Sequence, residues 1–442
     1  MKNALFFLAC FIMACHPGPS KEKKDSIAAG PGDTAKTAVQ KVNLPPPYAT
    51  KSALNPPDVI GWGENATPVA PNGFTVTRYA GDLDNPRWIY VLPNGDVLVA
   101  EAKKDPNKLK KVYDVVTGKN KSQRKSEYAN RIILFRDTNK DGTPDHKHDF
   151  ITGQNLPFGM LLLNNYFYLA NTDALWRFPY RENETSIMAK GEKIADIPGG
   201  GEGHWTRSLV ANAAGTKLYI GVGSESNVGE DGIEQEKNRA CILEVNPDGS
   251  GLRVFAGGLR NPVGIAFYPG TNTLWAVVNE RDGLGDELVP DYLTHVLENG
   301  FYGWPYAYYG QNPDPRLTGK EQRPELVKRT IVPDVSLGAH TAALGLAFYD
   351  KNKFPEKYRG GAFIGLHGSW NRSALAGYKV IYVPFKNGKP FGVPEDFLTG
   401  FISDASKSQA YGRPVGVAVL PDGSLLVADD AGNTIWRVHY TK

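Results

Sequence analysis

The sequence has little cysteine and almost no net charge. Its 442 residues include three cysteines, and the formal net charge is +3 at pH 7. Because so small a charge creates no strong overall electrostatic field, a nucleic-acid-binding role is not favoured, and we expect no nucleic acid among the partners. The apolar stretch near the N-terminus is too short to span a bilayer. Any membrane attachment is therefore expected through a lipid anchor only.

Glycine, proline and aromatic residues, by contrast, are plentiful. There are 48 glycines and 32 prolines, and 11% of the residues are aromatic. This composition favours a β-rich domain with many turns over a helical bundle. The chain is also long enough to bury a large core, so the composition predicts an all-β protein.

The first twenty residues, MKNALFFLACFIMACHPGPS, predict an export signal, because one lysine precedes an apolar stretch of the length of a secretion signal. The stretch ends in IMAC, where a small residue stands immediately before Cys15, and this resembles the bacterial lipobox. We therefore predict cleavage before Cys15, lipidation of its thiol, and an exported, membrane-anchored lipoprotein facing the periplasm or the cell exterior. The alternative is an ordinary signal peptide with an incidental cysteine.

Three segments follow from this interpretation: a signal peptide at 1–14, a flexible tether at 15–50 that starts at the lipidated cysteine, and a catalytic domain at 51–442. The tether is rich in Lys, Ser, Ala, Pro and Gly, and it has too few apolar residues to fold. Cys241 is then the only cysteine left in the mature domain, so it has no intrachain disulfide partner. It lies in the strand-like sequence RACILEVN, which favours a buried apolar role.

A pattern of two apolar strands joined by a turn recurs along the chain. In NPRWIYVLPNGDVLVAE, residues 85–101, the strands flank an Asn-Gly turn, which is a hairpin signal. Related copies occupy residues 156–172, 204–224, 261–280, 340–369 and 413–430. Because such recurrence is typical of four-stranded blades, the six copies predict a six-bladed β-propeller. Residues 73–80 could close the ring by pairing with the last strand, NTIWRVHY.

The innermost strands of a propeller all start at the same mouth of its central channel. The residues just before each copy should therefore converge there. They are Arg87, Phe158, His204 with Arg207, Arg260 with Asn261, His340, and Arg413. The sequence thus predicts a polar site that several blades build together.

The chain carries six motifs in order: GHWTRSLV, GLRNPVGIAF, NERDGLGDELVPDYL, NGFYGWPYAYYG, GLHGSWNRS and GRPVGVAVLPDGSLLVADD. Together they resemble the motifs of pyrroloquinoline-quinone (PQQ)-dependent sugar dehydrogenases, most closely the sorbosone or aldose dehydrogenase branch, over roughly residues 70–440. The resemblance implies a six-bladed propeller whose mouth holds the quinone and a calcium ion. It also implies oxidation of an aldose at its anomeric carbon.

The resemblance assigns a catalytic role to His204, which matches the family's base. A neutral imidazole there would take the proton of the sugar hydroxyl while hydride passes to the quinone. Arg260 and Asn261 match the pair that contacts the quinone carbonyl oxygens, where a guanidinium stabilises developing negative charge. The alternatives are a structural histidine and a capping pair at a turn.

The same resemblance implies two further cofactor-binding arginines, and the positions of two histidines add further candidates. Arg413 matches an arginine that binds a cofactor carboxylate, for which a planar two-pronged donor is well shaped. Arg372 occupies the region from which the family sends another cation to the quinone. His340 stands at the start of a strand and His367 at the end of one, so both could line the mouth. A buried structural role is the alternative for His367.

The acidic loop NERDGLGDE matches the stretch whose backbone carbonyls ligate the catalytic calcium in the family. Calcium takes about six to eight oxygen ligands, several of which the quinone can supply. Arg281 and Asp282 replace the glycine and proline typical of the soluble glucose-oxidising members, which suggests that Asp282 or Glu280 contributes instead. Glu287 and Tyr302 match positions of a structural calcium pair. The alternative is a solvated acidic turn.

Two other charged segments are ambiguous. Residues 137–145, DTNKDGTPD, resemble the start of a calcium loop, but position twelve would be His148, so an Asp/Gly turn is an equal alternative. Residues 103–125 interrupt the first copy with nine Lys or Arg and two Asp. They are expected to be a solvated loop, or else to approach anionic lipid or an electron-accepting partner.

The sequence therefore predicts a quinoprotein that oxidises an aldose or related sugar to a lactone or acid, with PQQ and Ca²⁺ as cofactors. Its electrons would pass to an external acceptor such as a cytochrome or a quinone. Two other classes of function stay open: a non-catalytic ligand-binding propeller, because one fold hosts many functions, and a calcium-dependent lactonase.

Overall fold

The structure, a computed structural model, describes residues 42–199 and 203–442. The predicted signal peptide, Cys15 and most of the tether lie outside these residues. The described residues fall within the unit Thr37–Lys442. Val42 and Leu44 already pack against a buried apolar cluster, and the Tyr48 amide donates a hydrogen bond to the Leu284 carbonyl at 2.8 Å. The chain thus contacts the domain before residue 50, where the tether was expected to end.

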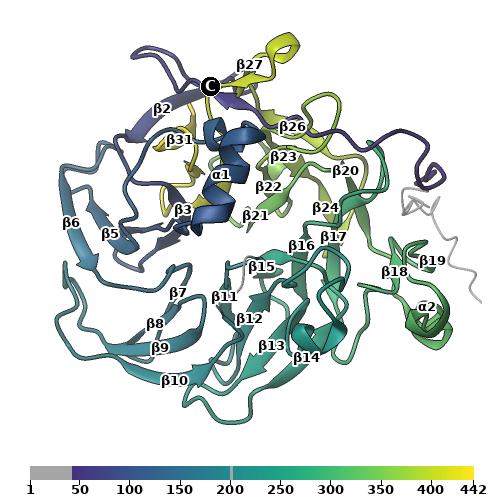
Figure 1. Cartoon of the computed structure of the whole chain (residues 1–442). Helices are drawn as coiled ribbons and strands as arrows, with labels where there is room; N and C mark the ends of the chain where they lie inside the picture. The colour runs from purple at the N-terminus through teal and green to yellow at the C-terminus, as the bar shows by residue number, and fades with distance from the viewer. Residues whose placement is uncertain (1–41, 200–202) are drawn as a thin grey trace, which may run out of the picture. The chain divides into compact units, whose positions relative to one another are not determined.

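In the described part of the chain, most strands form six four-stranded antiparallel sheets (Figure 1). The first three sheets are β3 (Pro86–Val91), β4 (Val97–Glu101), β5 (Arg131–Arg136) and β6 (His146–Ile151); β7 (Gly159–Leu163), β8 (Tyr166–Ala170), β9 (Ala174–Pro179) and β10 (Glu192–Asp196); and β11 (Leu209–Ala211), β12 (Leu218–Val222), β13 (Cys241–Val245) and β14 (Arg253–Gly257). The others are β15 (Pro262–Phe267), β16 (Leu274–Val278), β17 (Pro290–Val296) and β20 (Val335–Ala339); β21 (Ala343–Phe348), β22 (Ala362–Leu366), β23 (Lys379–Val383) and β26 (Glu395–Leu398); and β29 (Pro414–Val419), β30 (Leu425–Asp429), β31 (Thr434–Tyr440) and β2 (Phe74–Ala80). Each predicted copy supplies the first two strands of one sheet.

Shorter strands and two short α-helices lie outside the six four-stranded sheets. They are the strands β1 (Asp58–Val59), β27 (Ile402–Asp404) and β28 (Gln409–Ala410), the ribbons β18 (Ala307–Tyr308) with β19 (Asn312–Pro313) and β24 (Phe385–Lys386) with β25 (Lys389–Pro390), and the helices α1 (Lys108–Val116) and α2 (Pro324–Arg329). No helix within residues 42–199 and 203–442 is long and apolar enough to cross a membrane.

Consecutive sheets are neighbours around a closed circuit. Strand β3 lies beside β7, β7 beside β11 and β11 beside β15, and the series continues through β21 and β29 back to β3 (Figure 1). The predicted pairing of residues 73–80 with the last strand is confirmed, because β2 pairs with β31 and Phe74 stands opposite Tyr440. This pairing gives the otherwise free edge of β31 a partner.

Hydrophobic clusters fill the space between neighbouring sheets, which explains why the inner strands are apolar on both faces. Strand β4 is buried along its whole length. Leu98 belongs to a cluster with Phe167 of the next sheet, whereas Val97 belongs to a cluster with Ile435 of the preceding one. Cys241 is buried in such a cluster, which confirms its predicted apolar role.

A separate apolar cluster lies where the six first strands meet. Each sheet contributes one side chain, from the first strand or the residues just before it: Trp88, Phe158, Trp205, Val263, Leu344 and Val415. Phe158, expected among the polar mouth residues, is a buried member of this cluster. Apart from Arg207, which follows Trp205, the remaining mouth residues precede their cluster neighbours by one to four positions. We call this cluster the apolar plug.

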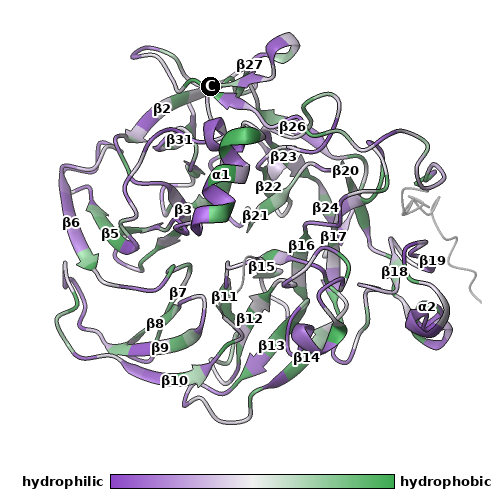
Figure 2. Cartoon of the chain, viewed as in Figure 1, coloured by the Kyte–Doolittle hydropathy of each residue, from purple (hydrophilic) through white to green (hydrophobic). Residues whose placement is uncertain are grey.

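Residues 103–125 differ from the expected solvated loop, because they contain helix α1. Asn107 caps α1 by accepting a hydrogen bond from the Lys110 amide, and the Lys110 ammonium pairs with Asp114 one turn later at 2.9 Å. The helix carries both hydrophilic and hydrophobic positions (Figure 2). Local capping and pairing thus give a helix where the density of charge suggested a loop.

The acidic loop at 137–145 is organised by hydrogen bonds within itself. The Asp137 carboxylate accepts from the Gly142 amide at 2.7 Å, and the Asp145 carboxylate accepts from the Thr138 amide at 3.0 Å. Asn139 accepts from the Asp141 amide at 2.9 Å. These contacts are those of an Asp/Gly turn. Calcium binding by this loop stays a prediction.

Candidate active site

His204 is held as a neutral base. Its Nδ1 lies 2.8 Å from the Ser224 carbonyl oxygen, which can only accept, so Nδ1 carries the proton and Nε2 keeps its lone pair. The side chain keeps a partly exposed edge, but burial and the positive charge of Arg260 lower the pKa of His204 to about 3. The imidazole is therefore an unprotonated acceptor throughout the neutral range.

Arg207, three residues later, does not reach the mouth. Its guanidinium donates to the His204 carbonyl at 2.9 Å and to the Pro198 carbonyl at 2.5 Å, and the side chain is fully buried. Burial lowers the pKa of Arg207 to about 9. Its role in this structure is to fix the backbone that carries His204.

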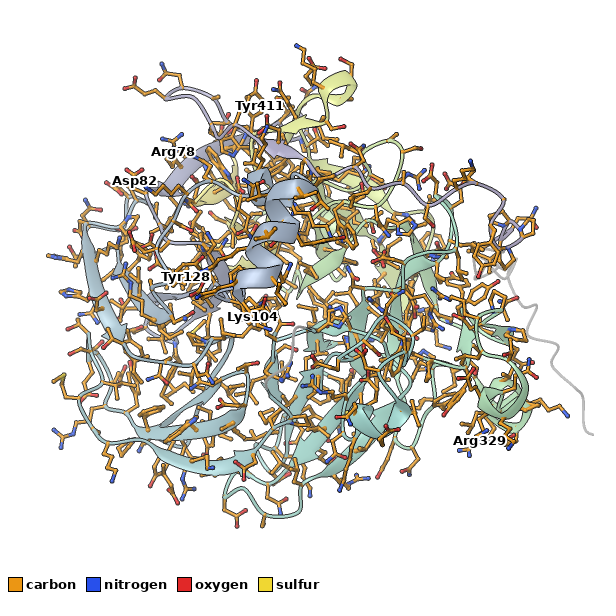
Figure 3. The ribbon with its side chains drawn as sticks, in the orientation of Figure 1. Arg78, Asp82, Lys104, Tyr128, Arg329 and Tyr411 are labelled. Carbon is orange, nitrogen blue, oxygen red and sulfur yellow. The ribbon has the colours of Figure 1, made fainter. Side chains whose placement is uncertain are left out.

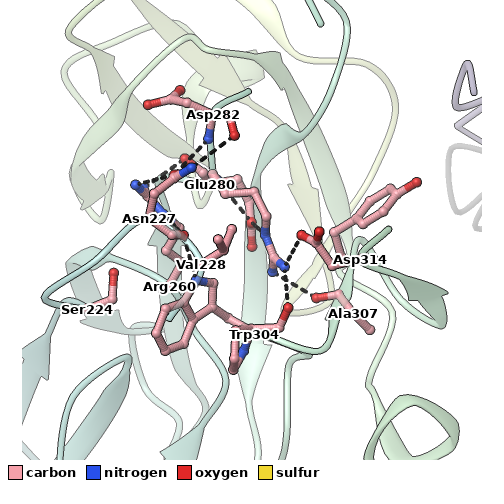
Figure 4. Close-up of polar contacts among 12 residues, drawn as sticks. Ser224, Asn227, Val228, Arg260, Glu280, Asp282, Trp304, Ala307 and Asp314 are labelled. Carbon is pink, nitrogen blue, oxygen red and sulfur yellow. Dashed lines mark hydrogen bonds and ion pairs between the residues drawn. The ribbon is translucent and has the colours of Figure 1, made fainter. Parts of the chain in front are cut away.

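Arg260 anchors the acidic loop through Glu280 and Asn227 (Figure 4). Its Nη1 donates to the Glu280 carbonyl at 2.8 Å, and its Nη2 donates to Asn227 Oδ1 at 3.0 Å. Asn227 in turn accepts from the Asp282 amide and donates to the Asp282 carbonyl, both at 3.0 Å. Sequence reasoning missed Asn227, which lies in the irregular segment SESNVGED between β12 and β13.

Asn261 presents a buried polar atom toward His204. Its Oδ1 is buried and has no hydrogen-bond partner among the described residues. Gly223 is wedged between the two side chains, because a Cβ placed there would lie 2.4 Å from Asn261 Oδ1 and 2.5 Å from His204 Cβ. An unpaired buried amide is costly unless a ligand or water satisfies it. The pair His204 and Asn261 thus has the character of a ligand-binding site.

A second cluster surrounds the buried carboxylate of Asp430. It forms an ion pair with Arg87 and accepts from His367 Nε2 at 2.8 Å. Burial and the charge of Arg413 lower the pKa of His367 to about 4, so this histidine is neutral. Arg413 donates to the His367 and Gly368 carbonyls at 3.1 and 2.7 Å. Sequence reasoning missed Asp430, although it directly follows strand β30 in the last copy.

The predicted calcium-site residues do not converge on one point. Arg281 is fully buried, and it pairs with Glu280 at 2.9 Å and with Asp314 at 3.1 Å. The Tyr302 hydroxyl donates to the His295 carbonyl at 2.6 Å. Among the residues described, no group of three or more His, Cys, Asp or Glu could hold a metal ion. The side chains present therefore do not form a protein-only calcium site.

Asp282 and His340 form the polar pair that does lie at the site. The imidazole contacts the Asp282 carboxylate at 3.1 Å through Nδ1 and the Gly285 carbonyl at 2.8 Å through Nε2. Burial opposes protonation of His340, but the Asp282 carboxylate outweighs it and raises the pKa of the imidazole. The carboxylate of Asp282 is thus engaged by a histidine.

Arg372 is placed away from this cluster. It donates to the Asp286 carbonyl at 2.6 Å and forms an ion pair with Glu287. Both Arg372 and Glu287 line a cavity of about 570 Å³ beside strands β20 and β23, and this cavity is lined by neither His204 nor Arg260. The two residues predicted for the quinone and for calcium therefore bind one another.

A larger cavity, of about 810 Å³, opens above the apolar plug. Arg87, Arg413, Trp205 and Trp370 form part of its wall, and residues of the α1 segment form another part. The cavity lies in the upper part of the range of about 300–1,000 Å³ that is typical of ligand sites. The cavity adjoins the Asp430 cluster through Arg87 and Arg413, and it approaches His204 through the next residue, Trp205. His204, Arg260 and Asn261 do not themselves line it.

These two depressed histidine pKa values predict a pH dependence of stability. A histidine in the unfolded chain has a pKa near 6.5, against about 3 for His204 and about 4 for His367 in the fold. Between these values each histidine is protonated in the unfolded chain but not in the fold, which lowers the free energy of unfolding as the pH drops, whereas burial raises the pKa of Asp291 and of Asp429 to about 6 and acts in the opposite direction. Urea unfolding of the protein and of a His204→Gln variant, both without ligands, separates the histidine contribution: the stability of the unmodified protein relative to the variant should fall as the pH drops from about 6.5 toward 4. A difference that stays constant across this range would contradict the burial of a neutral His204.

The fold and site define the class of protein: an all-β chain with a neutral histidine beside a large cavity lined by cations. The TrAA12-like family model matches residues 68–292 and 320–441, and the chain belongs to this family. An uncharacterised protein of Borreliella burgdorferi is 32% identical over 65% of this chain and 76% of its own length. The family indicated by the sequence motifs is thereby confirmed.

Relatives with a named activity or family include fungal proteins. A pyrroloquinoline quinone-dependent pyranose dehydrogenase of Coprinopsis cinerea is 22% identical over 83% of this chain, which spans about half (54%) of that relative. The holo PQQ domain of a pyranose dehydrogenase from Coprinopsis cinerea superposes with a TM-score of 0.67 at 19% identity, covering 87% of this chain and 100% of that one. A calcium structure of a Trichoderma reesei family AA12 enzyme gives 0.67 at 18% identity, covering 84% and 97%. At these identities the superpositions show a shared fold.

Proposed function

We propose that the protein is a PQQ-dependent dehydrogenase that oxidises a sugar at a CH–OH group, with the six sheets as the blades of a six-bladed β-propeller. The observation that carries the proposal is His204, a neutral imidazole with a free Nε2 beside the unpartnered Asn261 Oδ1. The named dehydrogenase relatives support the assignment. When bound, PQQ supplies the oxidant, because its quinone can accept a hydride.

The residues at the cavity fit a flat cofactor that carries several carboxylates. Arg87 and Arg413 line the cavity, and Arg87 Nε is buried without a partner among the described residues. Guanidinium groups bind carboxylates through paired donors. Trp205 and Trp370 add aromatic surfaces on which a planar ring system can pack. Arg260 and Asn261, next to His204, would hold the quinone oxygens.

The role of His204 follows from its tautomer. Nε2 accepts the proton of the sugar hydroxyl while the C–H hydrogen leaves as hydride, so the substrate carbon becomes a carbonyl carbon. If the anomeric hydroxyl reacts, the product is a lactone, which water opens to an acid. The Ser224 carbonyl holds Nδ1–H throughout, so the ring keeps its orientation as it becomes charged.

Calcium and the lipid anchor belong to the proposal as further parts. Support for calcium comes from the Trichoderma reesei calcium structure. Because the described side chains form no protein-only calcium site, we derive no step through the metal. Export and lipidation at Cys15 rest on the IMAC sequence alone. Electrons would leave to an acceptor outside the chain.

The test is reconstitution of the purified apo-protein. Addition of PQQ with calcium should quench the fluorescence of Trp205 and Trp370, and the loaded protein should reduce a redox dye when an aldose is added. Omitting PQQ, or adding a chelator before loading, provides the controls. The proposal fails if addition of PQQ with calcium changes neither the fluorescence nor the absorbance, and if no aldose in a broad panel leads to reduction of the dye.

A further inference from the structure

The α1 segment, residues 103–125, turns the cavity above the plug into a strongly cationic site. Of its residues, those that line the cavity with charged side chains are Lys103, Lys104, Lys110, Lys111, Lys119, Arg124, Lys125 and Asp114. Arg87 and Arg413 add two charges from the sheets below. One carboxylate thus faces nine cationic side chains. Lys104 and Tyr128 lie beside one end of α1 (Figure 3).

Acidic groups within the segment neutralise only part of this charge. Lys110 pairs with Asp114 at 2.9 Å and Lys111 pairs with Asp105 at 2.8 Å, which uses both aspartates of the segment. Lys103 contacts the neutral Ser126 hydroxyl at 3.1 Å, and Lys119 lies 3.6 Å from the centre of the Trp370 ring. Burial lowers the pKa of both Lys103 and Lys119. A bound anion would offset the energetic cost of burying the ammonium groups of Lys103 and Lys119.

The two walls of the cavity have separate tasks in the proposed enzyme. Arg87 and Arg413 belong to the sheets and lie next to the Asp430 cluster, where the cofactor carboxylates would bind. The lysines of the α1 segment come from the opposite wall, which an insertion into the first sheet supplies between β4 and β5. The contacts of Lys103 and Lys119 are with a neutral hydroxyl and with aromatic rings, so the charge of these two lysines is available to a second anion.

We propose that the α1 segment selects a sugar that carries an anionic group, a carboxylate or a phosphate ester, and that Lys103 and Lys119 contact this group. This inference rests on the proposed dehydrogenase function, because it names the substrate class of the same site. An ammonium group binds either anion as a compact charge, so the shared chemistry is a negatively charged sugar. A neutral sugar would leave these partly desolvated lysines without a counter-charge.

The first experiment compares three ligands that share one pyranose ring: D-glucose, D-glucuronate and D-glucose 6-phosphate. Binding to the PQQ-loaded protein is measured by calorimetry, and dye reduction is measured separately. At least one anionic sugar should bind about tenfold or more tightly than glucose. Its affinity should fall as salt is added. Preference for the carboxylate or for the phosphate identifies the source of the charge. Equal affinity for all three would overturn the inference while leaving the dehydrogenase proposal intact.

The second experiment uses matched variants of the α1 segment. Lys103→Gln with Lys119→Gln should weaken binding of the preferred anionic sugar by about tenfold for each lysine, with PQQ affinity unchanged. The control, Lys108→Gln with Lys121→Gln, removes the same charge from residues of the segment that do not line the cavity. Loss of PQQ affinity with unchanged discrimination between sugars would mean that the two lysines serve the cofactor, and this would overturn the inference. If no sugar is oxidised but the anionic one binds, the dehydrogenase proposal fails and the anion site stands.

Discussion

Replacement of His204 with alanine should lower kcat for sugar-dependent dye reduction by about 10²–10⁴-fold. The variant lacks the Nε2 lone pair to which we assign the hydroxyl proton in the proposed mechanism, whereas the cavity wall formed by Arg87, Arg413 and Trp370 is untouched. The affinity for PQQ, measured by fluorescence titration, should therefore stay close to that of the unmodified protein. Loss of kcat without loss of cofactor binding separates a base from a residue that only shapes the cavity.

The control for this prediction is His148→Ala, because His148 is an exposed histidine on strand β6. It should leave kcat unchanged. Added imidazole should restore part of the activity of the His204 variant if the missing function is proton acceptance. Turnover by His204→Ala within a factor of about three of the unmodified protein would remove His204 from the mechanism and favour a binding role for the site.

Replacement of Asp430 with asparagine should lower the free energy of unfolding by about 3–5 kcal/mol, because it leaves the buried Arg87 guanidinium without its counter-charge. Asp430 is fully buried, and it binds Arg87 and His367 at once. Burial raises the pKa of its carboxyl, but the hydrogen bond that neutral His367 donates and the charge of Arg87 outweigh this and hold the pKa well below its usual range. The stabilisation is therefore complete at neutral pH and is lost as the pH falls below about 4.

Urea unfolding at pH 7 measures this loss, and an exposed ion pair provides the control. Asp396 pairs with Lys379 at 2.6 Å with both side chains partly or largely exposed. Asp396→Asn should therefore change stability by about 0–1 kcal/mol. If the two variants are equally stable, the Asp430 cluster does not carry the energy assigned to it. A stable but inactive Asp430 variant would indicate that the cluster serves the site rather than the fold.

Much of the fold could be predicted because its signals are local and repeated. Each hairpin has its own turn and its own pair of apolar strands, so residues 85–101 predict β3 and β4 without knowledge of any other segment. The pairing of β2 with β31 could also be predicted, because one strand before the first copy and one strand after the last copy each lacked a partner within the repeats. Helix α1 was missed because the nine basic residues of 103–125 suggested a solvated loop and hid a short capped segment whose stability depends on Asn107 and Lys110.

The site was only partly predictable, because its geometry depends on side chains whose partners are distant in sequence. His204 and Asn261 were found from their motifs, and the structure brings them to either side of Gly223. Nothing in the motifs shows that Arg281 turns inward to Glu280 and Asp314, or that Arg372 turns to Glu287. In both cases a buried or nearby carboxylate competes with the expected ligand. A motif gives the type of a residue, but it does not show which carboxylate elsewhere in the chain will bind that residue in the fold.

The apolar plug has a consequence for the order of chemical events. One apolar side chain from each of the six sheets packs into a single cluster, so we expect the sugar and the electron acceptor of the proposed dehydrogenase to reach the site from the same side of this cluster. In the proposed mechanism the oxidised sugar would then leave before the electron acceptor binds. Steady-state rates plotted in double-reciprocal form should accordingly give parallel lines, the signature of a double-displacement cycle.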